Sequence, residues 1–191
     1  MARLKSGDKR NAILSAATEV VAERGIVATT AAIAKSAGVS EGTIFTYFLT
    51  KDELLNTLYR EIKLEVADAM MSDYPRRSSV RNRLQHVWNR YVDWGAENLK
   101  KHRVLQHIIM WTGLTCETKA AGSAPFIEVR RMYTEATEQR LLRELPEEFV
   151  AATMSALSDM TVGFMQSQPE QAAMYRDTGF EMLWAALAKK R

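Results

Sequence analysis

The chain has 191 residues, a formal net charge of +3 and 47% hydrophobic residues. This composition is sufficient for a packed core and excludes a disordered chain. The sequence contains no run of 18 or more apolar residues, so it indicates no membrane-spanning helix. The basic residues near the start are followed by no apolar signal segment, and the single cysteine, Cys116, allows no disulfide within the chain. We therefore expect a cytoplasmic protein.

The positive charge is concentrated in the first part of the chain. Residues 1 to 51 contain seven basic and four acidic side chains, whereas the remainder contains 19 of each sign. Residues 1 to 7, with Arg3 and Lys5, are expected to form either a basic arm that follows DNA or a plain disordered terminus. The charge distribution favours contact between this part of the chain and nucleic-acid phosphates.

Three helices are predicted within the first 48 residues. The first begins at about Asp8 and ends at Gly25. Two shorter helical patterns, from Thr29 and from residue 41, meet at the sequence AGVS, residues 37 to 40. There Gly38 can adopt the left-handed conformation that ends a helix, and Ser40 can cap the next one. The pattern is helix, sharp turn, helix.

The helix predicted over residues 41 to 48 has two different faces. Ile44 and Phe48 lie on one side and anchor it. The opposite face carries small or flat side chains that allow close approach to a large partner: Gly42, Thr43, Phe45 and Thr46. This arrangement is typical of a helix that enters the DNA major groove, and the alternative is an ordinary helical hairpin.

Residues 8 to 53 resemble the DNA-binding domain of the tetracycline-repressor (TetR) family. The first helix ends in ERG and is followed by T-x-x-x-IA-x-x-AGVS-x-GT-[IL]-[FY]-x-YF-x-x-K-x-x-L, present here as Thr29, Ile33-Ala34, Ala37 to Ser40, Gly42 to Phe45, Tyr47-Phe48, Lys51 and Leu54. Two positions depart from the family pattern. Ala32 stands where a capping partner for Thr29 is usual, and Phe45 stands where a tyrosine hydroxyl usually contacts phosphate.

The resemblance implies a set of DNA contacts for this chain. Side chains at or near the bases would be Ser40, Thr43, Phe45 and Thr46. Phosphate contacts would come from Thr29, Tyr47 and Lys51, while Gly42 would allow the backbone to approach the DNA. None of these residues is an Arg, Asn or Gln that grips a base edge bidentately, so we expect readout through thymine methyl groups, water and DNA shape.

The remainder of the chain is predicted to be helical throughout. Thr50 to Glu53 form a capping box, from which a helix runs to about Met71 as the covalent link to the rest. The later helices are predicted over 80 to 100, 103 to 116, 125 to 144, 147 to 167 and 169 to 189. The expected fold is all-α with about nine helices, divided into a helix-turn-helix DNA-binding domain, 1 to 51, and a ligand-binding and dimerisation domain, 52 to 191.

The interior of the second domain is rich in aromatic and methionine side chains. Residues 104 to 114, VLQHIIMWTGL, are apolar almost all round and predict a buried helix. The resemblance implies a pocket for a small, hydrophobic or aromatic effector, and for each single candidate a place in the plain core is the alternative that its pattern favours. The candidate lining residues are Trp88, Tyr91, His107, Met110, Trp111, Tyr133 and Met154.

The last two predicted helices are apolar on more than one side. One face can pack inward, and the resemblance implies that the other joins a second subunit in a four-helix bundle, forming a homodimer; a core helix within one chain is the alternative. No catalytic residue, metal site or cofactor motif is found, and Cys116 is a lone cysteine near Trp111. The sequence therefore predicts a ligand-responsive repressor that binds a palindromic DNA operator. A helical small-molecule-binding or adaptor protein that acts through protein contacts is the alternative.

Overall fold

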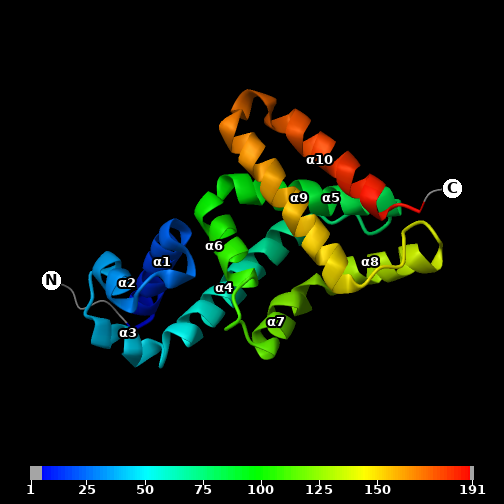
Figure 1. The fold of residues 1–191 in the computed structure, drawn as a ribbon. Coiled ribbons are helices and arrows are strands. Elements are labelled where there is room, and N and C mark those ends of the chain that lie inside the picture. The colour runs from blue at the N-terminus through cyan, green and yellow to red at the C-terminus, as the bar shows by residue number, and fades with distance from the viewer. Residues whose placement is uncertain (1–5, 190–191) are drawn as a thin grey trace. The chain divides into compact units, whose positions relative to one another are not determined.

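The computed structural model describes residues 6 to 189, without the side chain of Ser6. This range contains ten α-helices and three short 3₁₀ helices (Figure 1). Within residues 6 to 189, the only β-type pairing is one isolated antiparallel bridge between Leu142 and Ala188. The all-α prediction is confirmed. Residues 1 to 5 of the predicted arm, 1 to 7, lie outside the described part of the chain, and its last two residues are the first of α1.

The described chain divides into two compact units. Unit 1 contains residues 6 to 64 together with Leu99–Ser123, and unit 2 contains Glu65–Asn98 together with residues 124 to 189. Both units share α4, whose first two thirds belong to unit 1. Two later helices, within residues 99 to 123, therefore belong to the same unit as the predicted helix-turn-helix. The division into functional domains at residue 51 remains a prediction from sequence.

Unit 1 is built around α1. Its elements are α1 (Ser6–Arg24), the 3₁₀ helix η1 (Gly25–Val27), α2 (Thr30–Ala37), α3 (Glu41–Tyr47), the first part of α4 (Lys51–Met71), α6 (Leu99–Ile109) and α7 (Cys116–Ser123). α1 packs against both α2 and α6. The side chains of Ile13, Ala17 and Val21, spaced three or four residues apart, are fully buried on its inner side. Because α1 supports α2 and α2 contacts α3, the hairpin rests on a packed base.

Unit 2 is a helical bundle. Its elements are the end of α4, α5 (Val80–Glu97), the 3₁₀ helix η2 (Ala124–Phe126), α8 (Ile127–Glu138), α9 (Glu147–Ser167), the 3₁₀ helix η3 (Pro169–Gln171) and α10 (Ala172–Leu187). α9 and α10 run side by side, coloured orange and red in Figure 1, and α5 packs against both. A Cβ at Gly179 would lie 2.5 Å from Thr161 Oγ1 and 2.6 Å from the Trp88 ring. The three helices can approach this closely only because Gly179 has no side chain.

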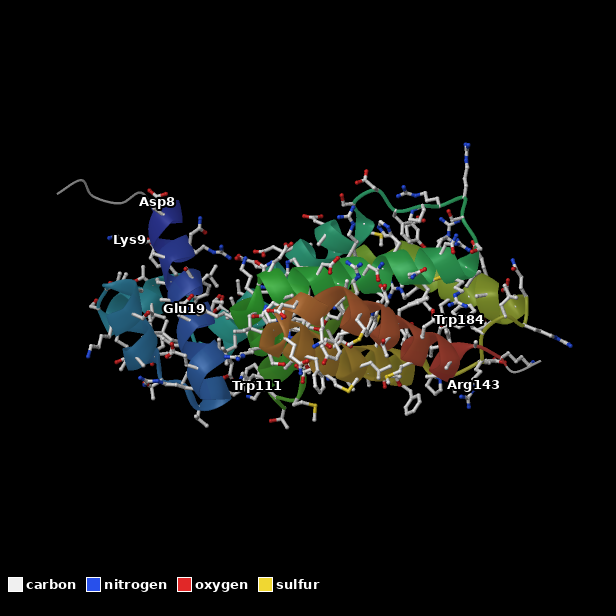
Figure 2. All side chains as sticks on the ribbon, turned by 90° about the horizontal axis from the view of Figure 1, so that it is seen from above. Asp8, Lys9, Glu19, Trp111, Arg143 and Trp184 are labelled. Atoms are coloured by element: carbon white, nitrogen blue, oxygen red, sulfur yellow. The ribbon has the colours of Figure 1, made fainter. Side chains whose placement is uncertain are left out.

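The chain after α8 pairs with the C-terminal end of α10. The helix predicted over 125 to 144 is wrong at this end, because α8 stops at Glu138 and Arg140 takes the left-handed conformation, with φ of 57°. The Arg143 amide then donates to Leu187 O at 2.8 Å. Figure 2 shows Arg143 at the same end of unit 2 as Trp184 of α10. An arginine gives no sequence signal for a left-handed stop, since glycine or asparagine is usual there.

The helix predicted over 103 to 116 is also wrong. α6 begins at Leu99 and ends at Ile109, and the Trp111 amide then closes a turn by donating to Ile108 O at 3.0 Å. Met110 is 85% exposed. The apolar run is therefore not one buried helix, because the chain leaves the helix in the middle of it.

A short helix that the sequence analysis missed follows this turn. Thr115 caps α7, its Oγ1 accepting from the Thr118 amide at 3.1 Å. Gly113 lies just before the cap, so glycine and threonine provide the usual stop and start signals. These signals were present, but the continuous apolar pattern outweighed them. Cys116, the first residue of α7, is exposed.

Candidate nucleic-acid interface

The turn between α2 and α3 has the geometry that the sequence predicts. Gly38 is left-handed, with φ of 65°, and the Val39 amide donates to Ala34 O at 3.0 Å. Ser40 Oγ then accepts from the Thr43 amide at 3.3 Å and caps α3. The polar groups at the two helix ends are thus satisfied by local hydrogen bonds.

α3 is anchored by its apolar side. Ile44 is fully buried and Phe48 is 2% exposed, whereas Ile33 and Ala34 of α2 are buried against the same core. Arg10 of α1 lies over the Phe48 ring, with its guanidinium carbon 5.7 Å from the ring centre, and forms an ion pair with Glu61 of α4 at 2.7 Å. The end of α3 is therefore held between two longer helices.

The other side of α3 is open to solvent. Ser40, Gly42, Phe45 and Thr46 are exposed, and Thr43 is half-buried. A Cβ built at Gly42 would come no closer than 4.0 Å to any other group, that group being Ser40 Oγ. The structure thus brings the base-facing residues together on one surface, where Gly42 leaves free space beside its backbone.

The hydroxyl groups on this surface are held in fixed orientations. Ser40 Oγ and Thr43 Oγ1 are 2.9 Å apart, and Thr46 Oγ1 donates to Gly42 O at 3.1 Å. A hydroxyl that donates to its own helix retains acceptor lone pairs and a methyl group for an external partner. The Thr46 side chain is therefore suited to accept a hydrogen bond or to contact a thymine methyl.

The predicted phosphate-binding residues lie at helix ends. Thr29 is exposed and caps α2 by accepting from the Ala32 amide at 3.2 Å, so the cap forms without the usual reciprocal partner. Tyr47 is half-buried in the last turn of α3. Thr30 Oγ1 donates to Glu41 Oε1, which ties the start of α2 to the start of α3. This tie strengthens the hairpin where the capping box is incomplete.

Lys51 begins α4 and is already engaged within unit 1. Its Nζ donates to Ile26 O in η1 at 2.5 Å, although the sequence favoured a phosphate contact for it. An ammonium has three donors, so the group can hold η1 and still contact a phosphate. The predicted cap by Thr50 is confirmed, because its Oγ1 accepts from the Glu53 amide at 3.0 Å. The Glu53 carboxylate reaches back to the Leu49 amide at 2.7 Å, one residue before the amide expected in a capping box.

Asn56 is a buried polar residue of α4 that sequence reasoning missed. Its Nδ2 donates to Gly113 O at 3.0 Å and its Oδ1 accepts from the Thr115 amide at 3.1 Å. Both partners belong to the turn between α6 and α7. An asparagine inside a helical pattern is normally predicted to be exposed. No local signal therefore indicates these hydrogen bonds between α4 and a turn about 60 residues away.

The three predicted effector residues of unit 1 do not converge on a closed site there. The His107 ring is exposed and lies against Gly25, whose missing Cβ would be 3.6 Å from it. Met110 points into solvent, and Trp111, labelled in Figure 2, folds back over Gly113. Their assignment to an effector site remains a prediction.

The four predicted effector residues of unit 2 have mixed surroundings. Trp88 is fully buried, and its Nε1 donates to Arg176 O at 2.8 Å. The Tyr133 hydroxyl donates to Arg143 O at 2.6 Å and accepts from the Leu145 amide at 3.2 Å. Both polar groups are thus occupied by structural hydrogen bonds, while Tyr91 and Met154 are half-buried.

A hollow of about 500 Å³ lies elsewhere in unit 2. It is lined by the end of α4, by α5 between Arg90 and Glu97, and by Met165 of α9, and none of the predicted effector residues lines it. Among residues 6 to 189, no three His, Cys, Asp or Glu side chains are grouped so as to hold a metal ion. In the same range, no helix is both long and apolar enough to cross a membrane.

An all-α chain with a capped helix-turn-helix and an open recognition face has the structure of a helix-turn-helix transcriptional regulator. Comparison with known proteins indicates which family of regulators the chain resembles. Residues 13 to 58 match the family described as "Bacterial regulatory proteins, tetR family". A putative tetR family transcription regulator from Shewanella sp. PV-4 has the same fold, with a TM-score of 0.84 and 25% identity over 95% of this chain and 99% of that one. Residues 13 to 58 thus match the TetR family of regulatory proteins, and the chain has the fold of a TetR-family transcriptional regulator.

Two curated relatives agree with this assignment. The fatty acid metabolism regulator protein of Bacillus subtilis is 34% identical over 80 residues, which are 41% of this chain and 41% of the relative. The chain thus spans about two fifths of that protein's length. The probable HTH-type transcriptional regulator ArpR of Pseudomonas putida is 26% identical over 92% of this chain and 91% of its own. The likeness therefore extends beyond the DNA-binding part.

Proposed function

We propose that the protein is a cytoplasmic, ligand-responsive repressor that binds a palindromic operator as a homodimer. The observation that carries the proposal is the exposed face of α3, on which Gly42 leaves an open backbone between oriented hydroxyl groups. This face fits the DNA major groove because its side chains are small or flat. Ser40, Thr43, Phe45 and Thr46 would read the bases, and Thr29, Tyr47 and Lys51 would hold phosphates.

A homodimer is supported by the outer face of α9 and α10. In unit 2 these helices pack inward through Val162, Met165, Phe180 and Leu183, all of them buried. Their outer sides carry exposed small or apolar residues at helical spacing: Ala152, Ala156, Met160, Gly163 and Phe164 on α9, and Met174, Thr178, Met182 and Ala185 on α10. We call this set the outer apolar face. Such a surface on adjacent antiparallel helices suits a two-fold four-helix bundle.

Release from DNA would follow from movement of α4. A dimer reads two half-sites only when its recognition helices are spaced by about one DNA turn, roughly 34 Å. α4 begins directly after α3, so an effector that binds better to a state with α4 displaced would change that spacing. Asn56, which ties α4 to the turn between α6 and α7, is the residue best placed to transmit such a change.

The test is DNA capture from a fragmented bacterial genome by the purified protein at near-physiological salt. We expect one or a few short palindromes to be enriched. Thr46→Ala should then change the sequence preference. Lys51→Ala should instead weaken binding to all sequences and reduce the slope of log affinity against log salt concentration by about one. Because Lys51→Ala also removes the hydrogen bond to Ile26 O, the melting temperature of this variant is measured together with its DNA affinity.

The matched control is Lys35→Ala, which removes an exposed ammonium from α2 but keeps the link to η1. A smaller loss of affinity than that of Lys51→Ala is expected, at unchanged stability. No enrichment of any DNA would contradict the proposed operator binding and favour a helical adaptor that acts through protein contacts. Equal losses on every sequence for Thr46→Ala and Lys51→Ala would contradict the assigned roles.

A further inference from the structure

Five buried polar side-chain atoms of unit 2 have no hydrogen-bond partner among the described residues. One is Arg176 Nε on α10, and the other four lie between residues 74 and 89. They are the Tyr74 hydroxyl, Arg83 Nε, His86 Nε2 and Asn89 Oδ1. We call these four residues the polar cluster. A buried donor or acceptor that stays unpaired costs about 1 to 3 kcal/mol, so four in one region require an explanation. None of the four residues belongs to the effector set predicted from sequence.

The polar cluster joins the segment before α5 to successive turns of α5. Arg83, His86 and Asn89 follow each other at intervals of three residues along α5. Tyr74, in the segment before α5, meets His86 edge to face, with the ring centres 5.9 Å apart and an angle of 73° between the planes. Tyr74 is only 6% exposed, and burial raises the pKa of its phenol above 10.0. The hydroxyl therefore stays protonated and available as a donor at neutral pH.

Charges around the polar cluster are balanced. The Arg83 guanidinium donates through Nη1 and Nη2 to Glu135 Oε2 of α8, at 3.2 and 3.1 Å, which leaves Nε as its unused donor. Arg76 lies 3.8 Å from Glu128 in an ion pair on the same side of the unit. An ionic ligand would disturb both pairs, whereas a neutral one would not. The unused atoms include donors and acceptors, because arginine Nε–H only donates and asparagine Oδ1 only accepts.

We propose that the polar cluster binds the polar end of the effector, and that this effector is a neutral, flat molecule carrying both a hydrogen-bond donor and an acceptor, such as an aromatic amide or a phenol. The inference rests on the proposed ligand response and narrows its chemistry. The aromatic edges of Tyr74 and His86 favour a flat group, and the balanced ion pairs exclude a carboxylate or an ammonium. A purely apolar ligand would leave all four atoms unpaired.

The experiment titrates the full-length protein, without DNA, with 4-hydroxybenzamide, and compares it with p-xylene, benzoate and benzylammonium by calorimetry. We expect 4-hydroxybenzamide to bind at least about tenfold more tightly than each of the other three. Tyr74→Phe and Asn89→Leu should each reduce that affinity by about tenfold and leave p-xylene binding unchanged. Affinity for 4-hydroxybenzamide no greater than for p-xylene, or unaffected by both substitutions, would overturn the proposal.

A stability measurement without any ligand provides a second readout. Tyr74→Phe deletes an unpaired buried hydroxyl and should leave the melting temperature unchanged or raise it, whereas Tyr133→Phe removes two formed hydrogen bonds and should lower it. If both substitutions lower it equally, the Tyr74 hydroxyl is already satisfied by ordered water and the proposal is overturned.

DNA binding separates this inference from the proposed function. If 4-hydroxybenzamide binds as expected but the protein retains no DNA, the polar cluster is a ligand site and the repressor function is wrong. The opposite outcome is that the protein binds an operator, and that an effector found by screening releases Tyr74→Phe and Asn89→Leu from this DNA as readily as it releases the unaltered protein. The repressor function then holds, and the polar cluster is not the effector site.

Discussion

Gly38 and Gly42 lie four residues apart in the helix-turn-helix and have similar room around them, yet their backbones differ. Gly38 has φ of 65° and no atom within 4 Å of a Cβ built on it, while Gly42 lies inside α3 with only Ser40 Oγ at 4.0 Å. Replacement by alanine thus meets no packing obstacle at either position. The two positions isolate backbone conformation from packing.

We predict opposite effects on stability for the two substitutions. Gly38→Ala should lower the free energy of unfolding by about 1 to 2 kcal/mol, because an L-residue is strained in the left-handed region. Gly42→Ala should raise it by up to about 1 kcal/mol, because alanine is the better helix former. Thermal and urea denaturation measure both, and a loss of stability in Gly42→Ala would show that its surroundings in unit 1 are not open.

Gly42→Ala should still lose operator affinity by about tenfold, since the added methyl occupies space that the DNA backbone or base edge would fill. The control is Gly7→Ala in the first turn of α1, which also has nothing within 4 Å of its Cβ position, lies off the exposed face of α3 and should reduce DNA affinity much less than Gly42→Ala does. Unaltered affinity in Gly42→Ala would contradict the close approach assigned to α3.

At the scale of whole elements, α7 affects the chemistry of one half-buried side chain, that of Lys63. Gly122 brings the α7 backbone onto α4, where a Cβ would lie 2.7 Å from the Tyr59 ring and 3.4 Å from Lys63 Cγ. Burial there lowers the pKa of the Lys63 ammonium from 10.5 to about 8. The native state therefore binds this proton less tightly than the unfolded chain does.

The sign of the pH effect follows from that difference. Below pH 8 both states are protonated, and the native state bears the full cost of burying the charge. Between about pH 8 and 10 the unfolded chain keeps the proton that the native state has lost, so this group makes stability rise with pH. We predict that Lys63→Met stabilises the protein by about 1 kcal/mol at pH 7 and by less at pH 9.5.

Chemical denaturation of Lys63→Met and of the unaltered protein at the two pH values measures this difference. Lys119→Met, which removes an exposed ammonium from α7, is the control and should change stability equally at both. A stabilisation by Lys63→Met that is independent of pH would show that packing, and not desolvation of the charge, limits this position.

Elements with local end signals were predictable from sequence, and elements that end for tertiary reasons were not. Pro146 and Pro169 bracket α9, whose predicted range of 147 to 167 is confirmed, and the cap by Thr50 marked the start of α4 correctly. α8 ends at Glu138, and Arg140 then turns the chain so that the following segment pairs with the end of α10, which no local pattern reveals. Sequence periodicity reports burial, but not where a buried chain turns.

The candidate sites show the same division. The exposed face of α3 could be derived from residue spacing, because its members are Ser40, the N-cap, and residues of the single short helix that follows it. The hydrogen bonds of Asn56 to Gly113 and of Arg83 to Glu135 join residues distant in sequence, so only the folded chain reveals them. Lys51 is intermediate, since its position was predictable and its bond to Ile26 O was not.

At the scale of the whole molecule, operator recognition by the proposed mechanism requires two copies of the chain. Met160 lies in the middle of the outer apolar face of α9 and is 43% exposed. Met160→Glu would place two carboxylates in an apolar two-fold interface, and each must then be desolvated without a partner. We predict that the variant sediments as a monomer at micromolar concentration, where the unaltered protein sediments as a dimer.

Loss of the dimer should reduce operator affinity by several orders of magnitude, because each half-site is then bound separately and the effective concentration of the second is lost. Ile127→Glu, which adds the same charge at an exposed position of α8, is the matched control and should change neither the mass nor the affinity. Dissociation by Ile127→Glu with a stable Met160→Glu dimer would move the interface from α9 and α10 to α8. If both variants remain dimeric and bind the operator fully, the outer apolar face is not the dimer interface.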